Sequence, residues 1–198
     1  EKLKKPLPGQ EAHLKMMPKE SARIRFDTNR IAQARLSSVL ILFYEKEGSI
    51  HIPLTQRHDY KGTHSGQVSL PGGKMEPNDI DLVHTAKRET REEIGVAEDE
   101  VEVIGQLSDI FIPPSNFKVS PILSFAKTKP VFDIDPYEVK ELLEVRLDHL
   151  LDEAILKRTN VPISNGLKMN APYFELEGKV VWGATAMMLS ELKTILLS

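Results

Sequence analysis

The sequence contains no cysteine among its 198 residues. Disulfide frameworks, zinc–thiolate centres and thiol nucleophiles are therefore excluded, and the absence is compatible with a reducing compartment. A strong charge of one sign is lacking too, because 26 Lys and Arg stand against 29 Asp and Glu, for a net charge of −3. This balance gives no support to nucleic acid or a membrane surface as a partner.

Long hydrophobic runs are also missing. The longest, Val39 to Tyr44, has the length of a strand and falls well short of the roughly 18 residues that span a bilayer. The N-terminal stretch EKLKKPLPGQEAH lacks the apolar core of a signal peptide, so we expect a cytoplasmic protein. The length fits one domain with additions, and we expect an N-terminal arm, residues 1–36, that packs on a domain of residues 37–198.

Turn signals and hydrophobic spacing predict many strands and two convincing helices. Two apolar, β-branched runs flank Glu47-Gly48, which is typical of a hairpin. Apolar residues at intervals of four predict a helix from Asp81 to Ile94, which Gly95 ends as a cap. This mixture favours an α+β fold. Further strands are expected within 66–70, 101–107 and 119–128, and two strands around Glu177-Gly178 within 171–183. Residues 138–152 are expected to start as a strand and to turn into a short helix, and an amphipathic helix is expected over 184–197.

The first of these helices carries three acids on one side. At about 100° per residue, Glu89, Glu92 and Glu93 lie within an arc of about 100°. Glu89 and Glu93 are like charges at i, i+4, and their repulsion lowers helix stability. Arg88 stands four residues before Glu92 and can offset part of the repulsion by pairing with it. Most such charge runs are solvated helix faces. The alternative is a bound cation, and ligands that are all oxygen suit a hard ion such as Mg²⁺ or Mn²⁺.

A glycine turn stands shortly before this helix. The turn Pro71-Gly72-Gly73 offers backbone N–H groups and a close approach for a phosphate. The acids are therefore held in a loop–helix unit, which favours a metal site over a solvated face.

The segment from Ser69 to Val96 resembles the Nudix box. That pattern is Gly, five residues, Glu, seven residues, Arg-Glu, an apolar residue, any residue, Glu-Glu, any residue, Gly and an apolar residue. Thr90 stands where an aliphatic residue is usual. The front half is one residue longer, so that Ile80 takes the place of the first Glu and Asp79 is the expected substitute. The residues that match in register are Arg88, Glu89, Glu92, Glu93, Gly95 and Val96.

The longer front half, together with the run PLTQRHDYKGTHSGQVSLPGG, resembles the coenzyme A pyrophosphatase branch of this family. Leu70, His58 and Gly62 depart from the signature of that branch. The resemblance extends over residues 39–198. The matching residues of the run are Leu54, Thr55, Arg57, His64, Gly66, Gln67, Ser69, Pro71, Gly72 and Gly73.

The resemblance implies an α/β/α sandwich with a mixed central β-sheet. It also implies a divalent-metal-dependent hydrolase that cleaves the pyrophosphate bond of a nucleoside diphosphate linked to another moiety. Coenzyme A or acyl-coenzyme A is the expected substrate, and ADP-ribose or a dinucleotide is the alternative. A catalytically silent Nudix binding module is disfavoured, because the helical acids are intact. The expected partner is thus a small-molecule nucleotide and neither nucleic acid nor a membrane, and a homodimer is compatible with the sequence.

The resemblance gives catalytic roles to Glu89, Glu92, Glu93 and Arg88. The three glutamates would hold Mg²⁺ or Mn²⁺, with Glu92 and Glu93 as the primary ligands and Glu89 as a ligand or base. Arg88 would orient the acids by pairing with them.

Substrate contacts are expected from residues of the upstream run and the turn: Arg57, His64, Gly72 and Gly73. Asp79 and Glu138 are candidates for an extra acid, with Asp79 a candidate partner of Arg88. An exposed loop acid is an equally good interpretation of Glu138.

Overall fold

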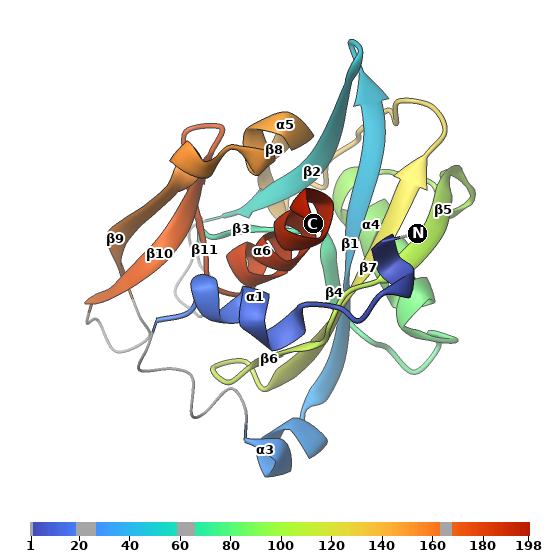
Figure 1. Cartoon of the computed structure of the whole chain (residues 1–198). Helices are drawn as coiled ribbons and strands as arrows, with labels where there is room; N and C mark the ends of the chain where they lie inside the picture. The colour runs from blue at the N-terminus through green and yellow to red at the C-terminus, as the bar shows by residue number, and fades with distance from the viewer. Residues whose placement is uncertain (1, 19–26, 59–65, 163–167) are drawn as a thin grey trace.

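The computed structural model describes residues 2–18, 27–58, 66–162 and 168–198, and it shows a large sheet, a small sheet and helices on both faces of the large one (Figure 1). The α-helices are α1 (Gly9–Lys15), α3 (Thr28–Ala32), α4 (Leu82–Ile94), α5 (Leu147–Leu151) and α6 (Gly183–Leu197). Short 3-10 turns are η1 (Lys2–Lys4), η3 (Glu98–Glu100) and η4 (Glu153–Ile155). The strands are β1 (Arg35–Lys46), β2 (Ser49–Arg57), β3 (Val68–Ser69), β4 (Gly72–Lys74), β5 (Val101–Gln106), β6 (Ile110–Ile112), β7 (Phe117–Ala126), β8 (Val139–Arg146), β9 (Leu156–Pro162), β10 (Lys168–Leu176) and β11 (Lys179–Trp182).

Strand β1 is the centre of the large sheet. Its first part pairs antiparallel with β4 and its end pairs antiparallel with β2. It also runs parallel to β7 over nearly its whole length, which makes the sheet mixed. Strands β5 and β6 extend the sheet beyond β7, whereas β3 and β8 extend it beyond β2. Strands β9, β10 and β11 form the small antiparallel sheet.

Both faces of β1 are buried, which explains its unbroken apolar run. Val39 and Ile41 point into a core shared with α1 and α6, whereas Leu40 and Leu42 point into a second core shared with α4. Side chains alternate across a strand, so a strand covered on both faces needs apolar residues at successive positions. The sheet is therefore a layer between helices, and the predicted α+β class and α/β/α sandwich are confirmed.

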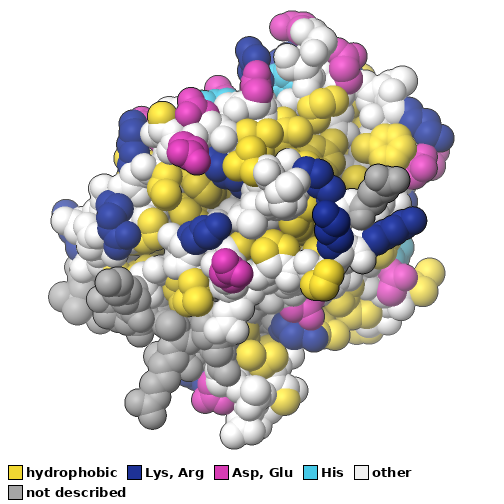
Figure 2. All heavy atoms as spheres, viewed as in Figure 1, with side chains coloured by type: hydrophobic (Ala, Val, Ile, Leu, Met, Phe, Trp, Pro, Cys, Tyr) yellow, Lys and Arg dark blue, Asp and Glu magenta, His cyan; other side chains and the backbone are white. Residues whose placement is uncertain are grey.

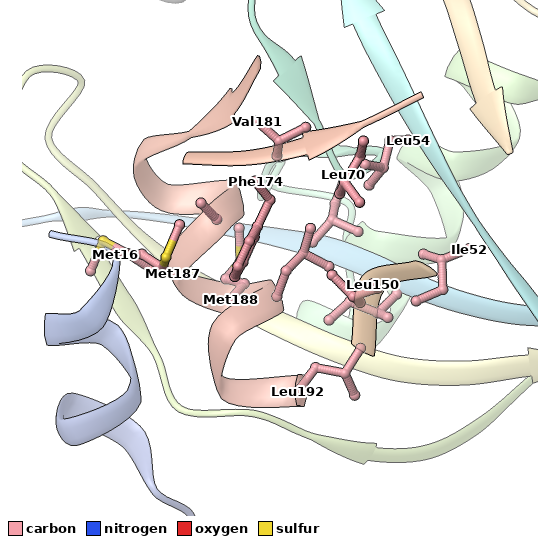
Figure 3. Packing of buried hydrophobic residues seen from close by; sticks show 14 of the residues in the cluster. Met16, Ile52, Leu54, Leu70, Leu150, Phe174, Val181, Met187, Met188 and Leu192 are labelled. Carbon is pink, nitrogen blue, oxygen red and sulfur yellow. The ribbon is translucent and has the colours of Figure 1, made fainter. Parts of the chain in front are cut away.

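Helix α6 closes the larger core and is buried over most of its surface (Figure 3). The sequence predicted an amphipathic helix, and the difference arises because the main sheet, the small sheet and α1 together surround it. Even Glu191 is fully buried in α6. Its carboxylate accepts hydrogen bonds from Gly9 N (3.1 Å) and Ser108 Oγ (2.7 Å) and lies 2.9 Å from His13 Nε2. Buried charge needs such partners, and here they come from the N-terminal arm and the main sheet's loops.

Gly9 and His13 thus bond to α6, and strand β1 of the large sheet begins at Arg35. The division into an N-terminal arm that packs on a domain stays a prediction, as does its boundary at residues 36 and 37. The predicted hairpin is present, with Glu47 and Gly48 at φ 53° and 75° between β1 and β2. No helix in the described ranges is long and apolar enough to cross a membrane. On the face shown in Figure 2, acidic and basic side chains are interspersed around a hydrophobic middle, in keeping with the small net charge.

Candidate metal and phosphate site

Helix α4 is capped at both ends, by Asp81, which the sequence predicted as its first residue, and by Gly95, which the sequence predicted as its C-terminal cap. The Asp81 carboxylate accepts a hydrogen bond from His84 N (2.7 Å) as the N-terminal cap. Gly95 ends the helix in the left-handed conformation, at φ 76°. Thr90, which stands where an aliphatic residue is usual, is fully buried and donates its hydroxyl hydrogen bond to Ala86 O (2.7 Å). The hydroxyl is thereby satisfied within the helix, so threonine is accommodated at this position.

Gly72 and Gly73 lie in β4, between β1 and helix α4. Gly72 has φ 151°, and a Cβ there would lie 2.3 Å from Ser38 O. A Cβ on Gly73 would lie 2.4 Å from the carboxylate of Glu89. A side chain on residue 72 would thus collide with β1, and the absence of one on Gly73 makes room for the Glu89 carboxylate.

Glu93 is the most enclosed acid of the helix. It is 4% exposed, and one carboxylate oxygen accepts a hydrogen bond from Gly72 N (3.2 Å). The pKa of Glu93 is raised to about 7, with burial as the largest cause and the charges of Glu138 and Glu89 as smaller ones, whereas Arg57 and the hydrogen bond from Gly72 N oppose the rise. Removing the carboxylate from water disfavours its charged form.

Glu89 also lies against β4, next to Gly73. Burial is the main cause that raises its pKa, and the charges of Glu92 and Glu138 add to the rise. Arg88, whose Nη1 lies 2.9 Å from Glu89 Oε1, counteracts part of it. The negative charges of the Glu89 and Glu93 carboxylates are thus only partly compensated by neighbouring positive groups.

Glu92 is placed differently. Its side chain is half exposed, with Oε2 2.9 Å from Arg88 Nη1 and Oε1 3.7 Å from Arg91 Nη2. The structure therefore brings Glu89 and Glu93 together and pairs Glu92 with two arginines. The ligand role predicted for Glu92 stays a prediction.

Arg88 joins the helix to the preceding loop. Its Nε and Nη2 donate to the two oxygens of Asp79, at 2.8 and 2.9 Å, in a bidentate pair. Asp79 also accepts from Glu76 N (2.8 Å) and Thr85 Oγ1 (2.9 Å). Hydrogen bonds from Arg88 are the largest cause that lowers the pKa of Asp79 far below its usual range. The expected pairing of Arg88 with Asp79 is observed, and it holds Arg88 beside Glu89.

Glu138 reaches the acids from a distant part of the chain. The segment 133–139 crosses the C-terminal end of α4, where Asp133 N donates to Ile94 O and Asp135 N donates to Glu93 O, both at 3.0 Å. Glu138 lies 3.7 Å from Arg57, which stands at the end of β2. The interactions that raise the pKa values of Glu89 and Glu93 include the charge of Glu138.

The predicted site residues thus gather around β4, with two qualifications. His64 lies outside the described residues. Gly72, expected at a phosphate, donates its N–H group to Glu93 here, and the phosphate contact stays a prediction. Sequence reasoning missed Asp133 and Asp135, whose backbone N–H groups bond the end of α4. The turn-forming composition of Asp-Ile-Asp-Pro is the only signal that could have pointed to them.

Mg²⁺ or Mn²⁺ is the ion that this site would be expected to hold. Within the described residues, no three acidic or histidine side chains lie close enough together to enclose an ion. The donor chemistry nevertheless fits, because Glu89 and Glu93 offer oxygen ligands whose charge is poorly compensated. The absence of a side chain at Gly73 leaves room for one of these carboxylates.

A family model described as the NUDIX domain matches residues 34–162. The chain is 31% identical over 177 residues to Nudix hydrolase 3 of Caenorhabditis elegans, covering 80% of this chain and 72% of that protein. It is 32% identical over 166 residues to Nudix hydrolase 15, mitochondrial, of Arabidopsis thaliana, covering 81% of this chain and 58% of that protein. It is 37% identical over 129 residues to a mitochondrial coenzyme A diphosphatase of Homo sapiens, covering 64% of this chain and 54% of that protein. The matched part is thus little more than half the length of the last two relatives.

Solved structures show the same fold at low sequence identity. The Nudix hydrolase RenU from M. smegmatis superimposes with a TM-score of 0.58 at 15% identity, over 83% of this chain and 86% of that one. A MutT/nudix family protein from Enterococcus faecalis gives a TM-score of 0.56 at 18% identity, over 83% and 63%.

Proposed function

Because the chain belongs to the Nudix family of hydrolases, we propose that it cleaves the pyrophosphate bond of coenzyme A or an acyl-coenzyme A. The observation that carries the substrate class is the 37% identity to the human relative named as a coenzyme A diphosphatase. The upstream run from Pro53 to Gly73 supports it, because it resembles the signature of the same branch. The products would be adenosine 3′,5′-bisphosphate and a phosphopantetheine.

The chemistry begins with the acids around β4. Glu89 and Glu93 would hold Mg²⁺ or Mn²⁺, which supplies Lewis acidity and neutralises the charge of the pyrophosphate when bound. Arg88 keeps Glu89 in place, and the buried pair with Asp79 prevents Arg88 from turning away.

Glu138 is the acid that we assign as the proton acceptor for the attacking water. It is about half exposed, whereas Glu93 is buried, Glu89 is mostly covered, and both are assigned to the ion. The neighbouring Arg57, 3.7 Å away, can orient the Glu138 carboxylate for this role.

Arg57 is our candidate for a phosphate contact on the adenosine half. Its guanidinium is partly exposed and is 3.7 Å from its nearest acidic partner, Glu138, which is longer than a close ion pair. A guanidinium binds phosphate oxygens in a fork that an ammonium cannot reproduce.

A substrate panel at fixed Mn²⁺, with products identified by mass, tests the proposed reaction. Coenzyme A or its thioesters should give the highest kcat/KM and release adenosine 3′,5′-bisphosphate. A clear preference for ADP-ribose or a dinucleotide would refute coenzyme A as the substrate and leave the hydrolase intact. No hydrolysis of any member would point to a silent binding module.

The Arg57→Ala variant tests the phosphate contact. It should raise the KM for coenzyme A about 10- to 150-fold more than the KM for the analogue that lacks the 3′-phosphate, the range expected for loss of a charged hydrogen bond of about 1.5–3 kcal/mol. Arg91→Ala is the matched control, because Arg91 is half exposed and pairs with Glu92 and Glu98. Equal losses on both substrates would mean that Arg57 serves the shared pyrophosphate or the fold.

A cytoplasmic location, a small-molecule nucleotide as the partner and a homodimer belong to the same proposal. The names of the plant and human relatives include a mitochondrial location, so fractionation of cells is needed to test the first of these.

A further inference from the structure

Tyr137 has the most exposed side chain among the large hydrophobic residues that the structure describes. It is 90% exposed, ahead of Ile80 and Val131. Single hydrophobic side chains at a surface are common and carry no meaning by themselves. The position of Tyr137 beside the acids of the site is what distinguishes it.

The backbone around Tyr137 is held rigidly against the site. Its own N–H donates to Asp135 Oδ1 (2.8 Å), and Asp135 N in turn donates to Glu93 O (3.0 Å). On the other side, His58 Nε2 lies 2.9 Å from Pro136 O. The segment is thus tied to the end of α4 and to the end of β2, while the ring stays in solvent. The backbone that carries the ring is therefore ordered before binding, so that binding has only the side chain of Tyr137 to order.

The neighbours of Tyr137 have the chemistry of a nucleotide site. The next residue, Glu138, lies 3.7 Å from Arg57, so that the aromatic residue directly precedes a carboxylate that contacts a guanidinium. A guanidinium pairs with phosphate, and an aromatic face stacks on a base. A nucleotide presents both groups within one small molecule.

We propose that the ring of Tyr137 stacks on the adenine base of the substrate and so fixes the nucleotide end beside Arg57. This inference rests on the proposed function, because it takes an adenine nucleotide as the substrate. The pantetheine arm is the other end of coenzyme A, and its aliphatic chain and amides have no aromatic face. Adenine therefore gains more from the ring than the arm does.

Binding of the two halves of coenzyme A to the intact chain separates these ends. Calorimetric titration with adenosine 3′,5′-bisphosphate and, separately, with 4′-phosphopantetheine would be done on the wild type, Tyr137→Ala and Tyr137→Phe. Tyr137→Ala should weaken binding of the adenosine nucleotide about 5- to 150-fold, the range for loss of one base–aromatic stack. Tyr137→Phe keeps the ring and should bind within about twofold of the wild type. Phosphopantetheine should bind all three proteins equally.

Val131→Ala is the matched control, because Val131 is 85% exposed and precedes the same segment without an aromatic ring. It should leave both affinities unchanged. In steady state, Tyr137→Ala should raise the KM for coenzyme A and leave kcat nearly unchanged.

Three results would overturn the proposal: unchanged nucleotide binding by Tyr137→Ala, weaker binding of phosphopantetheine instead, or an equal loss for both halves. The last result would show that Tyr137 maintains the conformation of segment 133–139 and does not stack on the base. The proposed function fails separately. A wild type that binds the adenosine nucleotide through Tyr137 but does not hydrolyse coenzyme A would refute the reaction and keep the stacking role.

Discussion

Replacing Glu93 with Gln should make the metal-free protein more stable above neutral pH while abolishing its activity. Gln has the shape of Glu and can still accept the hydrogen bond from Gly72 N (3.2 Å in the wild type). It lacks the charge that burial and the neighbouring acids disfavour. The substitution therefore separates the destabilisation that the buried charge causes from the contribution of that charge to hydrolysis.

The sign of the pH effect follows from the pKa of Glu93, which rises from 4.5 to about 7 on folding. The folded state holds the proton more tightly than the unfolded state, so wild-type stability is highest when Glu93 is protonated. That stability falls as the pH rises from about 4.5 to about 7 and is lost above it. A difference of this size corresponds to at most about 3 kcal/mol.

Urea unfolding in EDTA between pH 5 and pH 8 measures the effect. Glu93→Gln should match the wild type near pH 5 and exceed it by about 2–3 kcal/mol near pH 8. Adding Mn²⁺ should stabilise the wild type and leave the variant unchanged. Hydrolysis by the variant should fall at least about 100-fold, because a charged group is lost from the reacting site.

Glu92→Gln is the control for this experiment, because Glu92 is half exposed and paired with arginines. Its stability should follow the pH dependence of the wild type. Parallel stability curves for Glu93→Gln and the wild type would refute the assigned cost of the buried charge. Normal hydrolysis by Glu93→Gln would place the reacting site elsewhere.

Two further substitutions test the supports of the site. Asp79→Asn removes the negative charge and replaces one of the two oxygens that accept from Arg88 with an NH₂ group, so it should cost about 2–4 kcal/mol in urea unfolding. A loss below about 0.5 kcal/mol would contradict the supporting role. Gly73→Ala would place a Cβ 2.4 Å from Glu89, so we expect weaker Mn²⁺ binding by calorimetry and slower hydrolysis with a folded protein. Gly48→Ala is the control, because a Cβ there meets no atom within 4 Å. It should keep full activity, although alanine at φ 75° costs about 1 kcal/mol of stability. Equal activity in the two variants would refute the claim that Gly73 makes room for Glu89.

The fold could be predicted where local pattern and tertiary environment agree. Helix α4 has apolar or buried residues at intervals of four, and its predicted cap at Gly95 is observed. Asp81, predicted as the first helical residue, is the N-terminal cap. Strand β1 reads as an unbroken apolar run because it is covered on both faces. Helix α6 shows where the pattern misleads, since its burial on most sides depends on α1 and on the small sheet, which are distant in sequence.

The division of work among the acids could not be predicted from helical spacing. Glu89, Glu92 and Glu93 share an arc of about 100°, but spacing fixes only the direction in which each side chain starts. The carboxylates of Glu89 and Glu93 lie against β4, whereas the Glu92 side chain pairs with Arg88 and Arg91 and is half exposed. Glu138 enters the same region through contacts between segment 133–139 and the end of α4.

The extra residue before the helix shows how structure can resolve what spacing leaves ambiguous. Asp79 stands one position before the place where the Nudix pattern has a glutamate, which is Ile80 here. Ile80 is 86% exposed, whereas Asp79 is buried and bonded to Arg88. A tight turn accounts for the shift, because Glu76 N donates to the Asp79 carboxylate (2.8 Å) and Asp79 N donates to Glu76 O (3.0 Å). The turn directs the shorter acid inward at Asp79, so that the longer loop still delivers a carboxylate to Arg88.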